Sequence, residues 1–466
     1  MNFYEIQKQL SIKLWILFFC YAMLAALIFQ KFILPLFPSL HAGNGLMLKD
    51  AAYFDSIASY LADQIHQYGW GKWQIYPATG AKGNVAILGA LYALFGHNTL
   101  IVIPVSSALH ALGGTLIFLL SRDLGDKTPA STYAGIIAAS LFVIFPSALT
   151  WYTQNHKDSY MISGVLLILL TWVRAIGAKN RFHSWLLLAV VHLLGILLIG
   201  SVRPLNLILL LLSTVGVWLA ILVTSFPQCE FKIKLPAVLY FTVAIVMLVG
   251  AIKVTSLIPV GNLQKEAVKK GYLVRHSKYT HNKNINKIHW KWSNGSFFPK
   301  FVENYFENAA KIRTEIIHHG LSVGARSIID GNIQPDNAIE FIRYLPRALQ
   351  VALFAPFPSS WFKETSIQRR IASGEMFIYY LFLPGIFLLF LYNRKPKVFI
   401  VLYFACLFLM IYAFAEANLG SLYRHRYGFL FLILMLGSLG WFTWFEKMGW
   451  LKRFDKLTTA TILGRN

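Results

Sequence analysis

An acidic motif follows the first long apolar stretch of the sequence, in the segment Lys49–Asp55 (KDAAYFD). Asp50 is followed at i+3 by Tyr53, and a carboxylate here could act as a general base toward a substrate docked at a lipid headgroup. If an α-helix begins here and continues to Ile65, it has one apolar stripe, with Asp55 and Asp63 on the opposite side. The stripe contains Asp50, Phe54, Ile57, Leu61 and Ile65. We expect an amphipathic helix lying on the membrane, with Asp50 at the apolar boundary and Asp55 in water. Alternatively, the acidic residues only solvate an interfacial helix.

Cationic residues flank several apolar blocks on the same expected side of the membrane: Lys82, Lys157, Arg203, Arg347, Arg424 and Arg426. Arginine suits bidentate recognition of a phosphate, and lysine acts as a point charge. Asp158, directly after Lys157, adds a second carboxylate to Asp50. Arginine, lysine and aspartate side chains together predict a site for a phosphate-bearing substrate. The alternative is that each cation binds headgroup phosphates and anchors its span.

The elements that would position these residues are membrane helices. The chain has 466 residues, of which 56% are hydrophobic and 14% charged, whereas soluble proteins carry nearer a quarter charged residues. A helix needs about 20 apolar residues to cross a bilayer. We therefore predict an all-α polytopic membrane protein with about ten transmembrane helices near Leu14–Phe37, Thr99–Leu120, Thr132–Ala148, Tyr160–Ile176, Trp185–Gly200, Leu205–Phe226, Ala237–Ile252, Met376–Leu391, Val398–Ala415 and Tyr427–Phe445.

The distribution of lysine and arginine predicts the orientation. With the N-terminus inside, every inside segment is basic, as the positive-inside rule requires; the segments contain Lys8, Lys13, Arg122, Lys127, Arg174, Lys179, Arg181, Lys232, Lys234, Arg394, Lys395, Lys397, Lys447, Lys452 and Arg453. Both termini are then cytoplasmic and Asp50 lies outside. The short apolar runs Asn84–Phe95 and Ala348–Phe357 stay outside as re-entrant or interfacial pieces. We expect a bacterial inner membrane, with the site on its outer face.

Three regions follow from this topology: an N-terminal membrane core (1–257) containing the first outer loop (38–98), a large outer loop (258–373) and C-terminal membrane helices (374–466). Residues 258–373 hold 17 Lys/Arg against 8 Asp/Glu, so +9 of the net charge of +23. This charge suggests an anionic partner such as phospholipid, lipid-linked phosphate or acidic glycan, and not nucleic acid. The loop histidines lack metal-ligand spacing; they are His276, His281, His289, His318 and His319. Cys20, Cys229 and Cys406 form no disulfide framework.

The motif Asp50-x-x-Tyr53 after the first span resembles the C-type (GT-C) membrane glycosyltransferases. The chain looks most like their branch of lipid-phosphate-sugar-dependent protein mannosyltransferases and aminoarabinose transferases. The run Lys82–Asn98 is similar to that branch's Lys/His-Pro-Pro segment ending in "lfG", without its prolines. Asp158 corresponds to the branch's second acidic position, and Arg424–Tyr427 (RHRY) resembles its Arg-Tyr signature. The resemblance covers about the first 180 residues and the tail, and the large loop matches no pattern.

The resemblance implies a polyprenyl-phosphate sugar as donor and an inverting displacement onto a cell-envelope glycan, lipid or protein. Asp50 would take the acceptor's proton, and Tyr53 would contact substrate. The departing lipid phosphate would be stabilised by Lys82 with Arg203, or with the pair Arg424 and Arg426. Asp158 would orient Lys157, the acceptor or a divalent cation, the one cofactor left open.

Two other functions remain open on the sequence. An O-antigen polymerase- or ligase-like enzyme also has many spans, a large outer loop and outer arginines, but it acts on lipid diphosphates. A flippase or transporter for lipid-linked sugars would need a polar cavity at membrane depth, where ionisable residues are costly. Well inside the expected spans only His110 and His192 are ionisable, and we interpret both as helix-packing residues.

Overall fold

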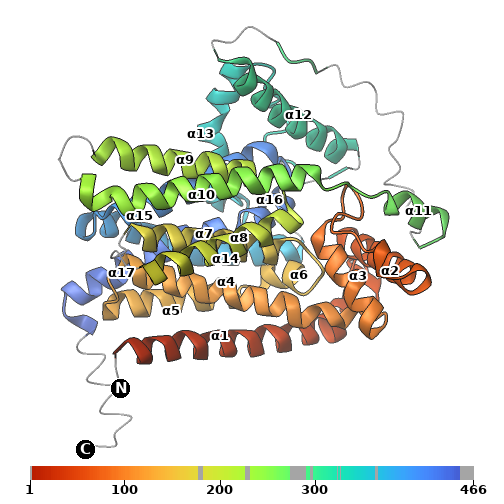
Figure 1. Ribbon diagram of the computed structural model, residues 1–466, viewed down its shortest axis with the longest axis horizontal. Helices are drawn as coiled ribbons and strands as arrows, with labels where there is room; N and C mark the ends of the chain where they lie inside the picture. Colours follow the sequence, from red (N-terminus) through yellow and green to blue (C-terminus); the bar gives the residue numbers. More distant parts are fainter. Residues whose placement is uncertain are drawn as a thin grey trace, which may run out of the picture. The chain divides into compact units, whose positions relative to one another are not determined.

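The computed structural model describes residues 3–176, 182–225, 231–272, 290–293, 298–322, 324–325, 327–362 and 366–451. Its described elements are almost entirely helical (Figure 1). The exception is a short antiparallel hairpin of β1 (His41–Gly43) and β2 (Leu46–Met47). The expected all-α class is therefore confirmed.

Nine helices in the described part of the chain are long and apolar enough to cross a membrane. A tenth span is formed if α5 (Pro129–Ile144) is joined to the segment Pro146–Tyr152, which bends away by 45° and contains α6 (Leu149–Tyr152). The prediction of about ten helices long and apolar enough to cross a membrane is confirmed. The nine spans are Gln9–Leu36, Thr99–Leu124, Asp158–Ala175, Ser184–Val202, Asn206–Thr224, Leu235–Leu257, Ile367–Tyr392, Pro396–Ala415 and Tyr427–Lys447.

The chain divides into two compact units. The first comprises residues 1–276, 385–401 and 435–466, and the second comprises residues 277–384 and 402–434. Three of the four unit boundaries fall inside membrane helices, namely α14 (Ile367–Tyr392), α15 (Pro396–Ala415) and α17 (Tyr427–Lys447).

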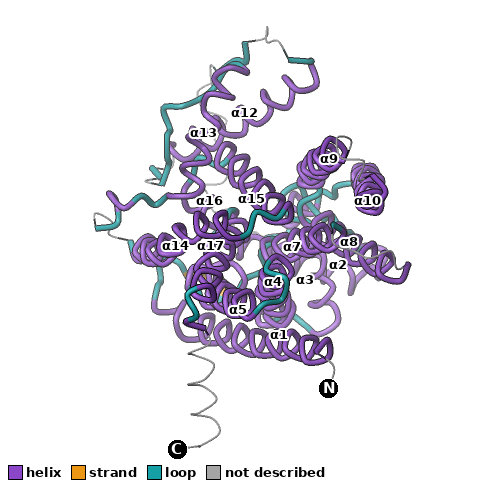
Figure 2. Tube along the Cα trace, turned by 90° about the vertical axis from the view of Figure 1, so that its left-hand side faces the viewer, coloured by secondary structure: helices purple, strands orange, loops and turns teal. Residues whose placement is uncertain are grey.

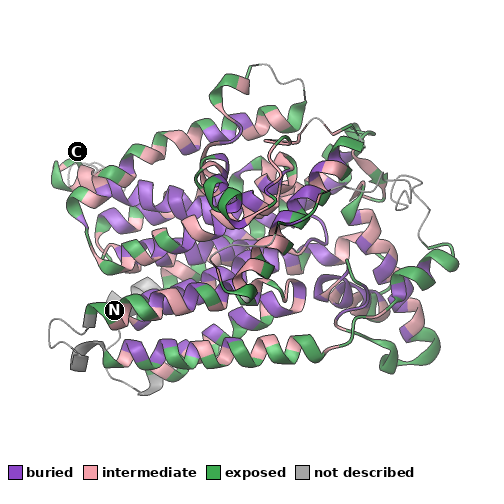
Figure 3. Cartoon of the chain, turned by 90° about the horizontal axis from the view of Figure 1, so that it is seen from above, coloured by how far each residue is buried: buried purple, intermediate pink, exposed green. Residues whose placement is uncertain are grey.

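Helix α4 (Val102–Leu124) is central among the N-terminal spans of the first unit. It packs against α1 (Phe3–Ile28), α5 and α7 (Asp158–Ala175), and α7 packs against α8 (Phe182–Val202) (Figures 1 and 2). Helices α9 (Asn206–Ser225) and α10 (Phe231–Leu257) run side by side. In α7 89% of the span is buried, against 22% in the apolar part of the first span, so the first span has a large surface for lipid. Figure 3 shows exposed positions along the outer sides of the helices.

Small residues allow the spans to approach closely. A Cβ atom on Gly164 of α7 would lie 2.8 Å from the carbonyl oxygen of Gly195 in α8, and one on Gly195 would lie 2.7 Å from that of Gly164. Such small-residue contacts are typical of helix pairs in membranes. The two span histidines are packing residues, as expected: the His110 ring stacks on Tyr152 with 4.2 Å between centroids, and His192 Nδ1 lies 2.9 Å from the Tyr240 hydroxyl.

The first outer loop contains α2 (Asp50–Tyr68) and α3 (Gly83–Phe95), which pack together beyond the ends of the spans (Figure 1). Each helix ends at a glycine with positive φ, Gly69 (+84°) or Gly96 (+86°), a conformation that glycine adopts without strain. At their contact a Cβ on Gly89 would lie 2.8 Å from Leu61 Cδ2.

The expectation that the apolar stripe of α2 faces the membrane is wrong. Its apolar stripe is buried as the periodicity indicates, but α3 and α11 (Leu263–Lys269) cover it instead of lipid. The buried cluster contains Phe54, Ile57, Leu61, Ile65, Val85, Leu88, Tyr92, Leu263 and Ala267. An amphipathic stripe predicts that one face of a helix is buried, but it does not indicate whether protein or lipid covers that face.

The second unit contains α12 (Lys300–Ser322), α13 (Ala338–Phe354) and α16 (Leu419–His425). Arg313 of α12 is fully buried and donates to the backbone carbonyls of Ile333 (3.0 Å) and Phe414 (3.1 Å). The run Ala348–Phe357, expected as a separate interfacial piece, is largely the second half of α13, whose Ala348 and Val351 are buried.

Candidate functional site

Asp50 opens α2, directly after the β1–β2 hairpin. Its side chain is exposed at the first turn of the helix, where the helix dipole favours a negative charge. Tyr53 is half-buried one turn later, and its hydroxyl lies 3.3 Å from where a Cβ on Gly80 would be. Burial, and then the charge of Asp50, raise the pKa of Tyr53 to about 12. Tyr53 therefore remains a hydrogen-bond donor at neutral pH.

Lys157 lies among four of the other predicted site residues. Its Nζ donates to the carbonyl of Gly80 (2.7 Å) and lies 5.5 Å from the centre of the Phe54 ring. Burial, and then the positive charges of Arg203 and Lys82, lower its pKa to about 8, although the charges of Asp158 and Asp50 oppose the shift. These five charged residues, namely Asp50, Lys82, Lys157, Asp158 and Arg203, are called here the Lys157 cluster.

Asp158 and Arg203 form an ion pair at the ends of two packed spans. Asp158 is the first residue of α7, and Arg203 directly follows α8. Arg203 Nη2 donates to Asp158 Oδ1 at 2.8 Å, with 4% of the aspartate side chain and 17% of the arginine side chain exposed. Because such a pair is desolvated, removing either partner leaves an uncompensated charge.

Lys82 directly precedes α3 and is half-buried. Its Nζ lies 4.7 Å from the centre of the Tyr76 ring, and burial lowers its pKa. The Tyr76 hydroxyl donates to the carbonyl of Gly200 (2.5 Å) near the end of α8. A Cβ on the next residue, Gly83, would lie 2.7 Å from the Ser201 carbonyl oxygen. These contacts hold the Lys82 segment against the end of α8, next to Arg203.

The loop between α6 and α7 joins the parts of the site. Gln154 accepts from the backbone N–H of Met47 (3.1 Å) and donates to the carbonyl of Gly45 (3.1 Å), which fixes the hairpin before Asp50. Asn84 of α3 donates to the carbonyl of Asn155 (2.9 Å). Sequence reasoning missed Gln154 and Asn84 as positioning residues. The polar run Thr153–Asp158 between two apolar segments was a visible signal for Gln154.

The exposures expected for the carboxylates of α2 are reversed. Asp50 is exposed, whereas Asp55, expected in water, is partly buried and accepts a hydrogen bond from the Tyr92 hydroxyl. Burial raises the pKa of Asp55. The reason is that α3 packs over this side of α2. Asp63 is also engaged, lying 3.2 Å from Nε2 of His97.

The three other predicted cations belong to the second unit. Arg347 is paired with Asp330, with 3.0 Å between Nε and Oδ2. Arg424 is half-buried on α16. Arg426 is fully buried, and its guanidinium donates to the carbonyls of Val351 (3.1 Å) and Ala352 (2.7 Å) in the last turn of α13. Terminal carbonyls of a helix have no partner within the helix, so Arg426 caps α13. A side chain so enclosed is not available to a substrate.

The donor set does not favour a divalent cation at Asp158. Its carboxylate is paired with Arg203, and Lys157 and Lys82 are nearby. Among the described residues there is no group of three or more His, Cys, Asp or Glu side chains that could hold a metal ion. His276, His281 and His289, which lacked ligand spacing in the sequence, lie outside the described residues. His318 Nε2 lies 3.3 Å from Gln334 Oε1, within hydrogen-bond distance.

Comparison with known proteins gives no assignment. No protein-family model matches the chain, and no curated protein matches it significantly. The functional argument therefore depends on the motif and on the geometry of the Lys157 cluster.

Proposed function

We propose that the protein is a membrane glycosyltransferase of the GT-C type, which moves a sugar from a polyprenyl-monophosphate donor to an extracytoplasmic acceptor. The observation that carries this proposal is the Lys157 cluster itself. Three cations and two carboxylates from separate segments of the chain meet in it. One carboxylate, Asp50, is exposed, as a group that receives a proton from an incoming acceptor should be.

The two carboxylates have different roles in this proposal. Asp158 is paired with Arg203 and orients that guanidinium. Asp50 takes the proton of the acceptor hydroxyl while the hydroxyl oxygen forms a bond to the anomeric carbon. The bond between that carbon and the phosphate oxygen breaks on the opposite side, which inverts the configuration.

The three cations stabilise the leaving group. When the glycosidic bond breaks, its electron pair remains on the lipid phosphate and increases its negative charge. Lys82, Lys157 and Arg203 supply fixed positive charge, and such preorganised stabilisation is commonly the largest catalytic contribution. Asp158 begins the span α7 and Arg203 follows the span α8, so the cluster lies at the depth of a lipid phosphate.

A donor competition assay tests the function. The purified full chain in liposomes is offered three labelled classes in turn: undecaprenyl-phosphate hexoses and pentoses, the matching nucleotide sugars, and a lipid-diphosphate oligosaccharide. We expect release of undecaprenyl phosphate from the first class only, and a loss of about 10²-fold or more in Asp50→Asn. Activity with the diphosphate alone would favour the polymerase or ligase, and turnover of nucleotide sugars alone would contradict the proposal.

Two charge variants test the phosphate-binding part separately. Lys82→Gln and Arg203→Gln should lower the rate with the monophosphate donor, because each removes positive charge from the leaving group. Lys72→Gln is the matched control, since Lys72 is an exposed lysine of the same loop outside the cluster. Equal rates in all three variants would remove the cluster from the mechanism.

A further inference from the structure

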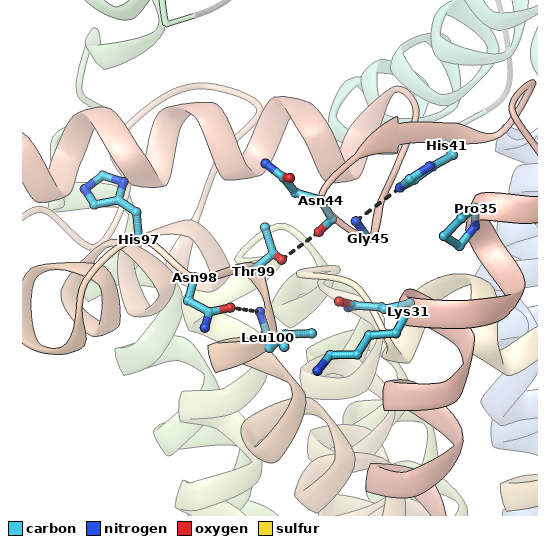
Figure 4. A pocket seen from close by; sticks show the side chains of 10 residues that line it. Lys31, Pro35, His41, Asn44, Gly45, His97, Asn98, Thr99 and Leu100 are labelled. Atoms are coloured by element: carbon cyan, nitrogen blue, oxygen red, sulfur yellow. Dashed lines mark hydrogen bonds between the residues drawn. The ribbon is translucent and has the colours of Figure 1, made fainter.

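A second polar site lies at the ends of two neighbouring spans in the first unit. It is an open pocket of about 590 Å³ lined by Gln30, Lys31, Pro35, His41, Asn44, Gly45, His97, Asn98, Thr99 and Leu100 (Figure 4). Its volume is within the usual range of ligand sites, about 300–1,000 Å³. The function proposed above uses none of these residues.

The position of the pocket corresponds to the headgroup layer of a membrane. Lys31 lies in a π-helical turn, Phe29–Ile33, near the end of the first span, and Thr99 opens the next span. The two spans pack together, and Trp15 Nε1 of the first donates to the carbonyl of Ala108 in the second (3.4 Å). A pocket between the same ends of two packed spans is therefore at the membrane surface.

The chemistry of the lining favours an anion. None of the ten lining residues is acidic, and Lys31 contributes an ammonium group. In Figure 4 Lys31 extends from the end of the first span toward Leu100. His41 accepts a hydrogen bond at Nε2 from the backbone N–H of Gly45 (3.2 Å). Its proton is then on Nδ1, which makes that nitrogen a donor.

Hydrogen bonds hold the walls of the pocket in place. Thr99 Oγ1 donates to the carbonyl of Asn44 (2.7 Å), which ties the start of the second span to the hairpin (Figure 4). Gly45 has φ +74° and packs on Gln30, where a Cβ would lie 3.0 Å from Oε1. Gln30 is 1% exposed and donates to the carbonyl of Thr153. These contacts fix the lining residues relative to one another, which lowers the cost of binding a ligand.

Large apolar side chains next to the lining residues in the sequence are exposed. Phe32 is 67% exposed and Leu36 74% exposed at the end of the first span, and Phe95 is 70% exposed just before His97. Exposed apolar side chains so close in the sequence to the lining residues suit the acyl chains of a bound lipid. They would have no role toward a soluble anion.

We propose that this pocket binds the phosphate headgroup of a membrane lipid. Lys31 is the cationic contact for the phosphate, and the acyl chains of the lipid lie along the exposed apolar side chains Phe32, Leu36 and Phe95. The proposal does not depend on the transferase activity. It predicts that the purified full chain retains dioleoyl phosphatidylglycerol in preference to dioleoylglycerol, which has the same chains without the phosphate.

Native mass spectrometry of retained lipid tests the proposal. Lys31→Gln should lower retention of phosphatidylglycerol about tenfold, the expected effect of losing one charged hydrogen bond. Asn98→Asp should lower it too by adding negative charge, while a carboxylate oxygen can still accept from the Leu100 N–H as Asn98 Oδ1 does (3.0 Å). The control is Lys72→Gln, which should retain lipid as the unaltered chain does.

Three outcomes would overturn the proposal. The first is equal retention of phosphatidylglycerol and dioleoylglycerol by the unaltered chain. The second is unchanged retention of phosphatidylglycerol in both Lys31→Gln and Asn98→Asp. The third is displacement of the lipid by millimolar inorganic phosphate alone, which would assign the pocket to a soluble anion. Donor turnover is measured on the same samples, so a failure here is separable from a failure of the glycosyltransferase proposal.

Discussion

Asp158 and Arg203, at the ends of two packed membrane helices, are joined by a hydrogen bond of 2.8 Å between Oδ1 and Nη2. The aspartate side chain is 4% exposed. This pair fixes the direction of a guanidinium in a site that contains two further cations. The two carboxylates of the Lys157 cluster thus differ in exposure, because Asp158 is buried in this pair whereas Asp50 is exposed.

The ion pair predicts a stability loss when one partner is removed. Asp158→Asn should lower the free energy of unfolding by about 3–5 kcal/mol, because Arg203 remains desolvated without its counter-ion. Thermal unfolding in detergent measures this. The control is Asp123→Asn, which breaks the pair of Asp123 with Arg174 (2.7 Å, arginine side chain 41% exposed) and should cost at most about 1 kcal/mol. Equal losses would mean that the Asp158 pair is not desolvated.

The lowered pKa of Lys157 predicts a pH dependence of the reaction. Lys157 is charged below its pKa of about 8 and neutral above it. If its charge stabilises the departing phosphate, the rate should fall as the pH rises through 8. Lys157→Arg should move this fall to higher pH, because a guanidinium stays protonated. Initial rates of donor turnover are measured from about pH 6 to about pH 10, a range that brackets this pKa. An identical alkaline limb in the arginine variant would assign the fall to another group.

The carboxylates of α2 should differ in their effect on transfer. Asp50→Asn should abolish transfer while membrane insertion remains normal. Asp55→Asn should retain most activity, because an amide oxygen can still accept the hydrogen bond from Tyr92. Donor turnover and membrane yield are measured for both variants. An inactive Asp55→Asn together with an active Asp50→Asn would place the base on the other side of α2.

The orientation predicted by the lysine and arginine distribution can be tested with single cysteines. In a background without Cys20, Cys229 and Cys406, Lys72→Cys should react with an impermeant thiol reagent added outside, whereas Lys127→Cys should react only after permeabilisation. Both positions are exposed in the structure, so burial does not explain a difference. Labelling of Lys127→Cys from outside in intact cells would contradict the predicted orientation.

The membrane helices and the apolar stripe of α2 could be predicted from the sequence because both are local patterns. A run of about 20 apolar residues spans a bilayer wherever it occurs, and a 3.6-residue period marks a buried face. The structure bears out both patterns. The same patterns do not say which neighbour covers a face, so the covering of α2 by α3 and the burial of Asp55 were not predictable.

Only the tertiary structure brings Asp50, Lys82, Asp158 and Arg203 close enough to Lys157 to act on its charge. The sequence indicates that each residue lies beside a span, but the partners of a span depend on contacts between distant segments, such as Gly83 against Ser201 and Gly164 against Gly195. Arg426 is the opposite case. Its position beside a span resembles that of Arg203, yet it caps the last turn of α13. Residue type and spacing determined which side chains could bind phosphate, and long-range packing decided which of them remain available to do so.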